Sequence, residues 1–247
     1  GEDGTYTVDL SNTAVLVDEE NTEYTSTADT SYTCYAPLIS KDASASYDER
    51  HDWNIIKTVD PESQSAFAGD PVNWTWTVEI IETVVDQNFA VTGDIDVTNP
   101  VGSPGDMTVS LADVLNDTTV ATVDCGDGAT SVTVAPGATE TCSYSASPAD
   151  ASATLNTATG TFNTIDFIAT ADVSFVTNVV NDSATFSDSY LGIGATVVTD
   201  PSTTNYPDGD VCSDNPADYT NGGKYSVTVD NVAYLVDEEG TQYDDDA

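Results

Sequence analysis

The sequence predicts an all-β protein built of Greek-key β-sandwiches, and three features of its pattern support that prediction. Short runs of β-branched and aromatic residues recur throughout, and Gly, Pro, Asn and Asp separate them at the spacing of turns. The segment Asn73–Ile80 alternates strictly between apolar and polar residues, as a half-buried strand does. Helical periodicity is almost absent, and only Leu111–Asn116 favours a helical turn.

The expected strands follow the β-branched runs in order, and turn dipeptides such as Asp60-Pro61, Asn99-Pro100 and Pro136-Gly137 separate several of them. Each run is short enough for one strand of a sandwich. The runs span residues 6–10, 15–17, 55–59, 74–81, 89–98, 108–111, 119–123, 131–134, 141–145, 154–162, 173–180, 196–198 and 224–229.

The composition excludes two classes of partner. Asp and Glu number 43 against four Lys and Arg, which gives a net charge of −39. Such a polyanion repels phosphates and anionic lipids, and no apolar run approaches the roughly 20 residues of a membrane helix. We therefore expect neither nucleic-acid binding nor membrane insertion. Because no signal peptide stands at Gly1, the chain is expected to be cytoplasmic, already processed or a piece of something longer.

The two ends of the sequence match each other. Residues 4–28 align without a gap to residues 223–247 at an offset of 219, and 13 of the 25 positions are identical. The match includes the run Leu-Val-Asp-Glu-Glu at 16–20 and at 235–239. Two related strand pairs within one domain would explain it, but a long-period repeat explains a match of this length at the termini better.

The four cysteines divide into a local pair and a distant pair. Cys125 and Cys142 flank an expected hairpin, where a disulfide is geometrically easy. Cys34 and Cys212 each lack a counterpart in the other copy of the repeat, so Cys212 of one unit is expected to join Cys34 of the following unit. A Cys34–Cys212 bridge within one chain is the alternative. Either arrangement favours an oxidising, extracellular compartment.

Several segments resemble the immunoglobulin-like modules of prokaryotic secreted and cell-surface fibre proteins. These segments are Trp53–Pro61 with Gly69-Asp70 and Trp74–Val78, then Val91–Pro100, the surroundings of Cys125 and Cys142, and Ala149–Thr159; Val180–Asp188 resembles the start of a second module. The resemblance implies tandem immunoglobulin-like β-sandwiches in a large secreted scaffold and no particular chemistry. The extreme acidity departs from that pattern, and so does the lack of a sortase-type anchor in this sequence.

Under that resemblance the sequence divides into three parts. Residues 51–170 form a complete sandwich, and residues 171–247 form the first part of a second one. Residues 1–50 supply strands of a split or shared sandwich, followed by a linker. A missing strand would leave an unpaired edge that a neighbour's strand can fill, and a contact of that kind does not close, so it would build a filament.

Candidate chemistry is sparse. His51 lies in an expected polar linker without a nucleophile motif, so no catalytic residue is assigned. Asp208, Asp210, Asp214 and Asp218 offer clustered hard oxygens for Ca²⁺, and residues 237–239 and 244–246 are further acidic candidates. A solvated acidic surface is the alternative for all of them. No other cofactor is expected.

Two covalent modifications are suggested by residue type. Asn73, Asn116 and Asn181 begin N-glycosylation sequons. Lys57 is a candidate for an intramolecular isopeptide bond with an asparagine such as Asn156, as in some pilin-like sandwiches.

The sequence therefore predicts a non-enzymatic structural subunit of an extracellular filament or surface fibre. Its partners would be other copies of itself, joined head to tail by strand sharing. A calcium- or carbohydrate-binding adhesin module is the alternative.

Overall fold

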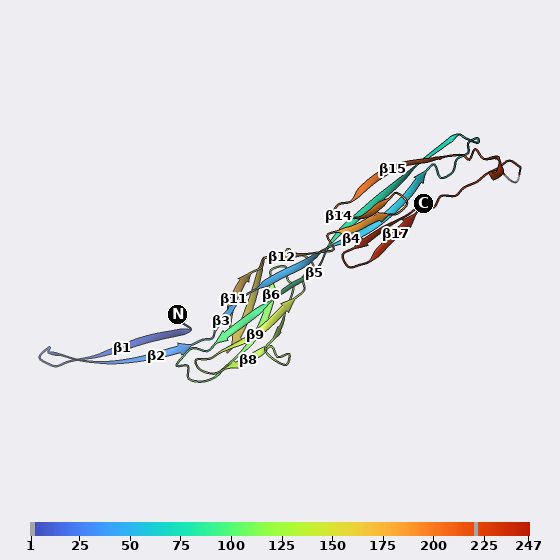
Figure 1. The fold of residues 1–247 in the computed structure, drawn as a ribbon. Coiled ribbons are helices and arrows are strands. Elements are labelled where there is room, and N and C mark those ends of the chain that lie inside the picture. The colour runs from blue at the N-terminus through green and yellow to red at the C-terminus, as the bar shows by residue number, and fades with distance from the viewer. Residues whose placement is uncertain (1–2, 220–221) are drawn as a thin grey trace. The chain divides into compact units, whose positions relative to one another are not determined.

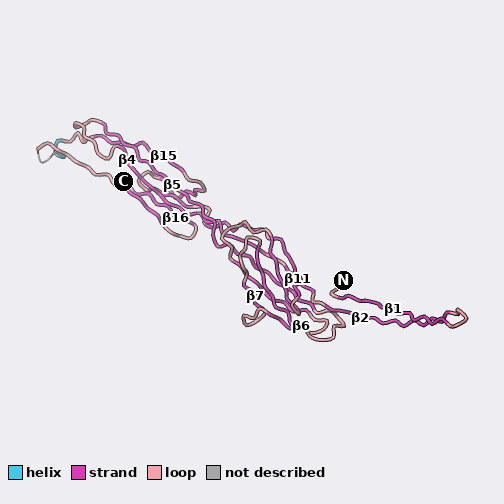
Figure 2. The backbone as a smooth tube through the Cα atoms, turned by 180° about the vertical axis from the view of Figure 1, so that it is seen from behind, coloured by secondary structure: helices cyan, strands magenta, loops and turns pink. Residues whose placement is uncertain are grey.

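The structure is a computed structural model that describes residues 3–219 and 222–247, and it confirms the all-β prediction (Figure 1). Strands dominate the backbone, as Figure 2 shows in magenta. The one helical element in the described ranges is a 3-10 turn, Pro216–Asp218 (η1). No helix in those ranges has the length and hydrophobicity needed to cross a bilayer.

The strands in chain order are β1 (Thr5–Val17), β2 (Glu23–Tyr35), β3 (Leu38–Lys41), β4 (Ser44–Asp60), β5 (Pro71–Thr98), β6 (Met107–Leu115), β7 (Thr122–Asp124), β8 (Ser131–Val134), β9 (Thr139–Ala146), β10 (Leu155–Phe162), β11 (Ile165–Asp172), β12 (Phe175–Val180), β13 (Ala184–Asp188), β14 (Ile193–Val198), β15 (Ser202–Val211), β16 (Val232–Asp237) and β17 (Gln242–Asp246).

The chain divides into two compact units, each assembled from two stretches of sequence. Unit 1 comprises residues 1–47 and 88–176, and unit 2 comprises residues 48–87 and 177–247. These divisions differ from the ones expected at residues 51 and 171. The chain passes between the units at 47/48, 87/88 and 176/177, and these crossings fall inside strands β4, β5 and β12, where the sequence carries no break in composition. Residues 51–87 therefore belong to unit 2 and not to the sandwich expected over 51–170.

Unit 1 packs two sheets face to face. One sheet has the order β11-β10-β6-β8, and the other contains β3, the second half of β5, β9 and β7. Apolar and polar residues alternate along the strands, so one face of each sheet is apolar and packs against the other sheet. In β6, for example, every second side chain is buried. The core includes Val91, Ile95 and Val97 from β5 and Val109, Leu111 and Leu115 from β6. The predicted Cys125–Cys142 disulfide is confirmed in this unit.

Unit 2 is a second, smaller sandwich. Its sheet β14-β13-β16-β17 faces the first half of β5, which pairs with β15 and β4. Trp53 and Ile55 on β4 and Val78 and Ile80 on β5 pack with Phe186 and Leu235. Of the alternating apolar face expected over Asn73–Ile80, made of Trp74, Trp76, Val78 and Ile80, the last three side chains are buried and Trp74 is half-buried.

Two expected elements were wrong. The segment Leu111–Asn116 was expected to form a helical turn, but as far as Leu115 it belongs to strand β6. The polar Asp113 occupies an inward-facing position of this strand and interrupts the alternation of apolar and polar residues that indicates a strand. The strand expected at 224–229 does not form beyond an isolated bridge at Lys224. The β16–β17 ladder instead starts where Asn231 and Ala247 exchange backbone hydrogen bonds, so the residues before Asn231 have no opposing strand there.

Candidate functional site

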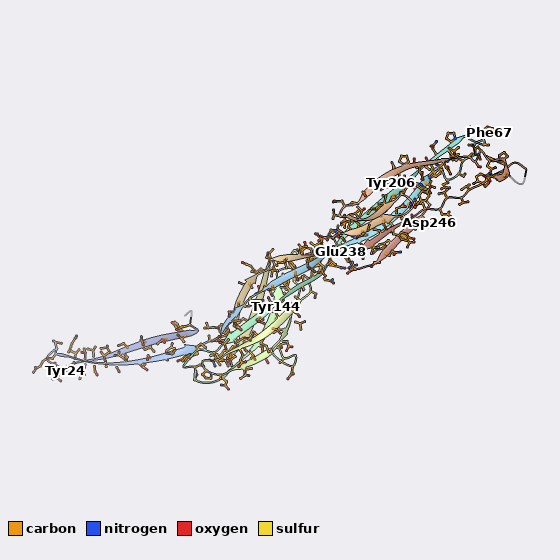
Figure 3. The ribbon with its side chains drawn as sticks, viewed as in Figure 1. Tyr24, Phe67, Tyr144, Tyr206, Glu238 and Asp246 are labelled. Atoms are coloured by element: carbon orange, nitrogen blue, oxygen red, sulfur yellow. A yellow bond between two sulfur atoms is a disulfide. The ribbon has the colours of Figure 1, made fainter. Side chains whose placement is uncertain are left out.

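The β1–β2 hairpin is a sheet with one unpartnered apolar face. Its two strands pair in register from Thr5–Tyr35 to Val17–Glu23, and among the described residues they pair with no other strand. One face is mostly apolar and carries the side chains of Tyr6, Val8, Leu10, Ala14, Leu16, Tyr24, Ala28, Tyr32 and Cys34, together with the polar Asn12, Ser26 and Thr30. Most of these side chains are exposed, and Tyr24 lies near the turn (Figure 3). The opposite face is mainly Thr, Ser and Asp, with the Thr7–Thr33 and Thr13–Thr27 hydroxyl pairs 2.9 Å apart, and it also carries the exposed Val15 and Val17 near the turn.

The hairpin β16–β17 of unit 2 has the same local structure. Leu16 pairs with Tyr24, and Leu235 pairs with Tyr243, which keeps the offset of 219. In each turn the aspartate accepts a hydrogen bond from the tyrosine hydroxyl at 3.3 Å, at Asp18 and at Asp237. The left-handed turn position is Asn21 in one hairpin and Gly240 in the other. The structure therefore extends the sequence repeat to register, turn type and side-chain bonding.

The two hairpins differ in what covers them. Ala233 and Leu235 are fully buried against β13 and the β4–β5 face of unit 2, whereas Leu16 is 67% exposed. An isolated two-stranded hairpin is marginally stable in water, and an exposed apolar face on one marks an interaction surface. Near its turn, at Ala14 and Leu16, the β1–β2 hairpin therefore presents the face that unit 2 uses to build its core, with no partner strand among the described residues. The equivalents of Tyr6 and Val8, Tyr225 and Val227, are exposed in unit 2.

The predicted distant cysteines are both free thiols. Cys34 lies exposed on β2 in unit 1, and Cys212 follows β15 in unit 2. Cys34 also borders a pocket of about 430 Å³ at the root of the hairpin, whose lining includes Tyr6, Phe162 and Phe167. The thiols thus remain available for pairing with another copy.

A second feature of unit 1 is a buried charged cluster. Lys41 on β3 forms an ion pair with Asp113 on β6, and both side chains are 0% exposed. The Lys41 Nζ also lies 4.2 Å from the ring centroid of Tyr144 on β9, which is labelled in Figure 3. In the β6–β10 ladder Asp113 pairs with Ala158, so Asn156 is its diagonal neighbour on the same face. Asn156 is fully buried, and neither its Nδ2 nor its Oδ1 makes a hydrogen bond of normal distance and angle to another described residue.

Unit 2 repeats this cluster with different residues. Lys57 on β4 forms an ion pair with Asp188 on β13, again with both side chains 0% exposed, and its Nζ lies 5.3 Å from the ring centroid of Trp76. Because Ser187 pairs with Tyr234, Asp188 comes opposite Ala233, two residues from Asn231. Asn231 is buried, and both of its amide atoms also lack a partner among the described residues.

Burial sets the protonation behaviour of these clusters. Desolvation lowers the pKa of both Lys41 and Lys57, against the opposing effect of Asp113 and Asp188. Burial also raises the pKa of Tyr144 to about 12, and an interaction with the Asn156 amide opposes that rise.

The sequence prediction placed Lys57 with Asn156, and that pairing is wrong. Lys57 belongs to the core of unit 2, and Asn156 belongs to unit 1. Sequence reasoning also missed Lys41, Asp113, Tyr144, Asp188 and Asn231. The sequence did carry a signal for these residues, because each charged residue lies two positions after an inward-facing apolar residue and therefore on the same face of its strand. The segments are Ile39-Ser-Lys41, Ile55-Ile-Lys57, Leu111-Ala-Asp113 and Phe186-Ser-Asp188.

The four aspartates of the predicted calcium site occupy two places. Asp208 and Asp210 lie on β15, whereas Asp214 and Asp218 lie around η1. Burial tends to raise the pKa of Asp208, but hydrogen bonds from the Gly209 backbone, Tyr190 and Trp76 outweigh it and lower the pKa. Asp218 accepts a hydrogen bond from the Ser213 hydroxyl at 2.5 Å. In the described ranges no three His, Cys, Asp or Glu side chains are grouped to hold a metal ion.

The three sequon asparagines differ in accessibility. Asn73 and Asn116 are exposed, although the Asn116 amide accepts a hydrogen bond from the Thr154 backbone at 2.9 Å. Asn181 is buried, and its Nδ2 donates to Asp237 at 3.1 Å. Asn181 is therefore a structural amide in the folded chain, and Asn73 and Asn116 are the accessible sequons.

His51 lies on strand β4 and not in the expected linker. Its Nδ1 forms a hydrogen bond with Glu82, and its Nε2 lies 3.5 Å from Glu49. The hydrogen bond to Glu82 is the main cause that raises its pKa. A raised pKa means that this pair stabilises the fold below the unfolded pKa of about 6.5 and that the contribution is lost as pH rises through the folded pKa.

The single histidine makes this contribution measurable. In an NMR titration of the imidazole protons we expect a midpoint above about 6.5, which Glu82→Gln lowers because it removes the main cause. Glu49→Gln is the matched control and should lower the midpoint less. Equal shifts for both variants would contradict the assignment to Glu82.

Comparisons with protein-family models and with curated proteins found no match to this chain.

Proposed function

We propose that this chain is a structural repeat unit of an extracellular filament or surface fibre, built from tandem immunoglobulin-like sandwiches. In this proposal the β1–β2 hairpin completes the unit 2 sandwich of a neighbouring unit and occupies the place that β16–β17 holds in this chain. The single observation that carries the proposal is the exposed apolar face of β1–β2, whose equivalents Ala233 and Leu235 are buried in β16.

The free cysteines support the same arrangement. Cys34 lies directly opposite Tyr6 in the hairpin, and Tyr6 is the equivalent of Tyr225. The ring of Tyr225 lies 6.0 Å from that of Tyr219, whose hydroxyl donates a hydrogen bond to the Ser213 carbonyl beside Cys212. A hairpin docked in register therefore carries Cys34 toward the Cys212 of its neighbour. A disulfide between them would lock the junction in an oxidising compartment.

The charge also constrains how such units associate. At a net charge of −39 per chain, neighbouring units repel each other over the Debye length of about 8 Å at physiological salt. Association must then rest on backbone pairing, burial of the hairpin's apolar face and covalent bonds. The face built by Leu10, Leu16 and Tyr24 carries no charged side chain and suits that role.

A tandem chain tests the proposal. Residues 1–222 joined to residues 4–247 reproduce the 219-residue period, with one hairpin at the junction and one free at the N-terminus. We expect hydrogen exchange at the junction hairpin to be as slow as in β16–β17, while the N-terminal hairpin exchanges fast. Oxidation should also form one additional disulfide, between Cys212 of the first copy and Cys34 of the second.

The control is the same tandem chain with Leu16→Asp at the junction only. This substitution places a charge in the core position of Leu235 and should abolish both the slow exchange and the additional disulfide. If the junction hairpin of the unmodified tandem exchanges as fast as the N-terminal one, strand sharing through this hairpin is wrong.

A further inference from the structure

The two buried lysines need an explanation that the fibre proposal does not supply. The chain has four Lys and Arg in all, yet Lys41 and Lys57 lie in separate cores with their side chains fully buried. Burying an ion pair costs several kcal/mol per ion before their attraction is counted, and an apolar pair is often as stable. A chain so poor in cations gains no net stability by placing two of them there as simple ion pairs.

Two buried asparagines also lack an evident structural role. The side-chain nitrogen and oxygen of Asn156 and Asn231 make no hydrogen bond of normal distance and angle to the described residues, and neither does Asp113 Oδ1. A buried polar group without a hydrogen bond costs about 1–3 kcal/mol, so each amide is a substantial loss. Native cores rarely tolerate such groups without a structural or chemical reason.

The same constellation occurs in both units. Each has a lysine on one sheet, an aspartate on another sheet that contacts its Nζ, and an Asn-x-Ala segment that places the amide diagonally to the aspartate. An aromatic ring, Tyr144 or Trp76, lies against each Nζ and helps to keep water out. Two cores with different surrounding sequences thus each contain a lysine amine, an aspartate carboxyl group and an asparagine amide in the same arrangement.

We propose that Lys41 is joined to Asn156, and Lys57 to Asn231, by isopeptide bonds that form within the folded chain. The neutral lysine Nζ attacks the Cγ carbonyl of the asparagine, and the C–N bond to the side-chain nitrogen breaks. The aspartate takes a proton from Nζ and returns one to the leaving nitrogen. The products are one secondary amide and one ammonia, so the reaction needs no cofactor, oxidant or energy source.

Each part of the cluster has a role in that step. Burial favours the neutral amine, because desolvation lowers the pKa of both lysines. Asp113 and Asp188 contact the reacting nitrogen and act as proton shuttles. Held in one packed core, the groups meet at a high effective concentration, and the lack of water prevents hydrolysis of the asparagine amide. The product removes a buried charge and the unpaired NH₂ group together.

Intact mass spectrometry of the reduced full-length chain tests the proposal. We expect the folded chain to be lighter than its sequence by two ammonia, and digestion to give branched peptides joining Lys41 to Asn156 and Lys57 to Asn231. Lys41→Arg keeps a positive charge for Asp113 but has no amine nucleophile, so the deficit should fall to one ammonia. Lys57→Arg should act in the same way on the other bond, and the double variant should have the full sequence mass.

Two further variants keep the test decisive. Asp113→Asn and Asp188→Asn leave lysine and asparagine in place and should each remove one ammonia from the deficit, because the proton shuttle is lost. Lys224→Arg changes an exposed lysine and should leave the deficit at two ammonia. A full sequence mass for the folded wild-type chain overturns the proposal. A deficit that survives both lysine substitutions also overturns it, because it would indicate succinimides at asparagine.

Discussion

Leu235→Ala should lower the free energy of unfolding of unit 2 by about 2–5 kcal/mol, because it opens a cavity in a core where this side chain is fully buried. Leu16→Ala at the equivalent position of β1 should change it by no more than about 0.5 kcal/mol, since Leu16 is exposed. The three Trp residues, Trp53, Trp74 and Trp76, all belong to unit 2. Urea unfolding followed by tryptophan fluorescence therefore reports on this unit alone.

The tandem chain turns that comparison into a test of strand sharing. With residues 1–222 joined to residues 4–247, Leu16 of the second copy occupies the position that Leu235 has in the single chain. Leu16→Ala at this junction should then lower the free energy of unfolding of unit 2 in the first copy by about 2–5 kcal/mol. The same substitution in the N-terminal hairpin should hardly change it. Equal effects of Leu16→Ala and Leu235→Ala in the single chain would mean that β1–β2 is already covered there, and would contradict the exposed hairpin.

Much of the fold could be predicted because sandwich strands have a strong local signal. The alternation through Trp76, Val78 and Ile80 sets their inward face without any knowledge of the partner sheet. The Cys125–Cys142 disulfide followed from proximity in sequence. The repeat was visible as identity at a fixed offset, and the structure shows the same register and the same aspartate turn in both copies.

Other features could not be predicted because they depend on long-range pairing. The passage of β4 and β5 from one unit to the other leaves no mark in a continuous alternating sequence. The lysine clusters are formed by residues far apart in sequence, and a charge at an inward position weakens the very alternation that would reveal it. Asp113 shows this directly, since its presence made β6 look like a helical turn.

Asn231, which is buried next to the first residue of β16, takes part in both the strand-sharing proposal and the isopeptide proposal. Its equivalent in β1 is Asn12, which shares the apolar face with Ala14 and Leu16 and is exposed. A hairpin docked in register would bring Asn12 to the place of Asn231, beside the Lys57 and Asp188 of the neighbouring unit. Strand sharing and isopeptide chemistry are therefore compatible at a junction, although each is tested separately.

Removing one member of the Lys57–Asp188 pair should be among the most damaging changes in unit 2. Lys57→Met removes the nitrogen that Asp188 contacts and, with it, the proposed bond to Asn231, and we expect a loss of at least about 3–5 kcal/mol in the free energy of unfolding. Asp188→Asn keeps the acceptor oxygen for the Leu191 backbone N–H but leaves Lys57 without its partner, so a similar loss is expected. Lys224→Met, at an exposed position, should stay within about 0.5 kcal/mol of wild type.

The double variant separates an ion pair from a cross-link. If Lys57 and Asp188 form only an ion pair, Lys57→Met with Asp188→Asn removes both charges and should restore stability to near the wild-type value. If Lys57 is bonded to Asn231, the double variant also loses a cross-link that closes a long loop, which contributes about 4–5 kcal/mol on the chain-entropy scale used for disulfides. We expect the second result in tryptophan-monitored urea unfolding, with the double variant well below wild type. Full recovery in the double variant would show that the buried lysine serves as a charge and carries no bond.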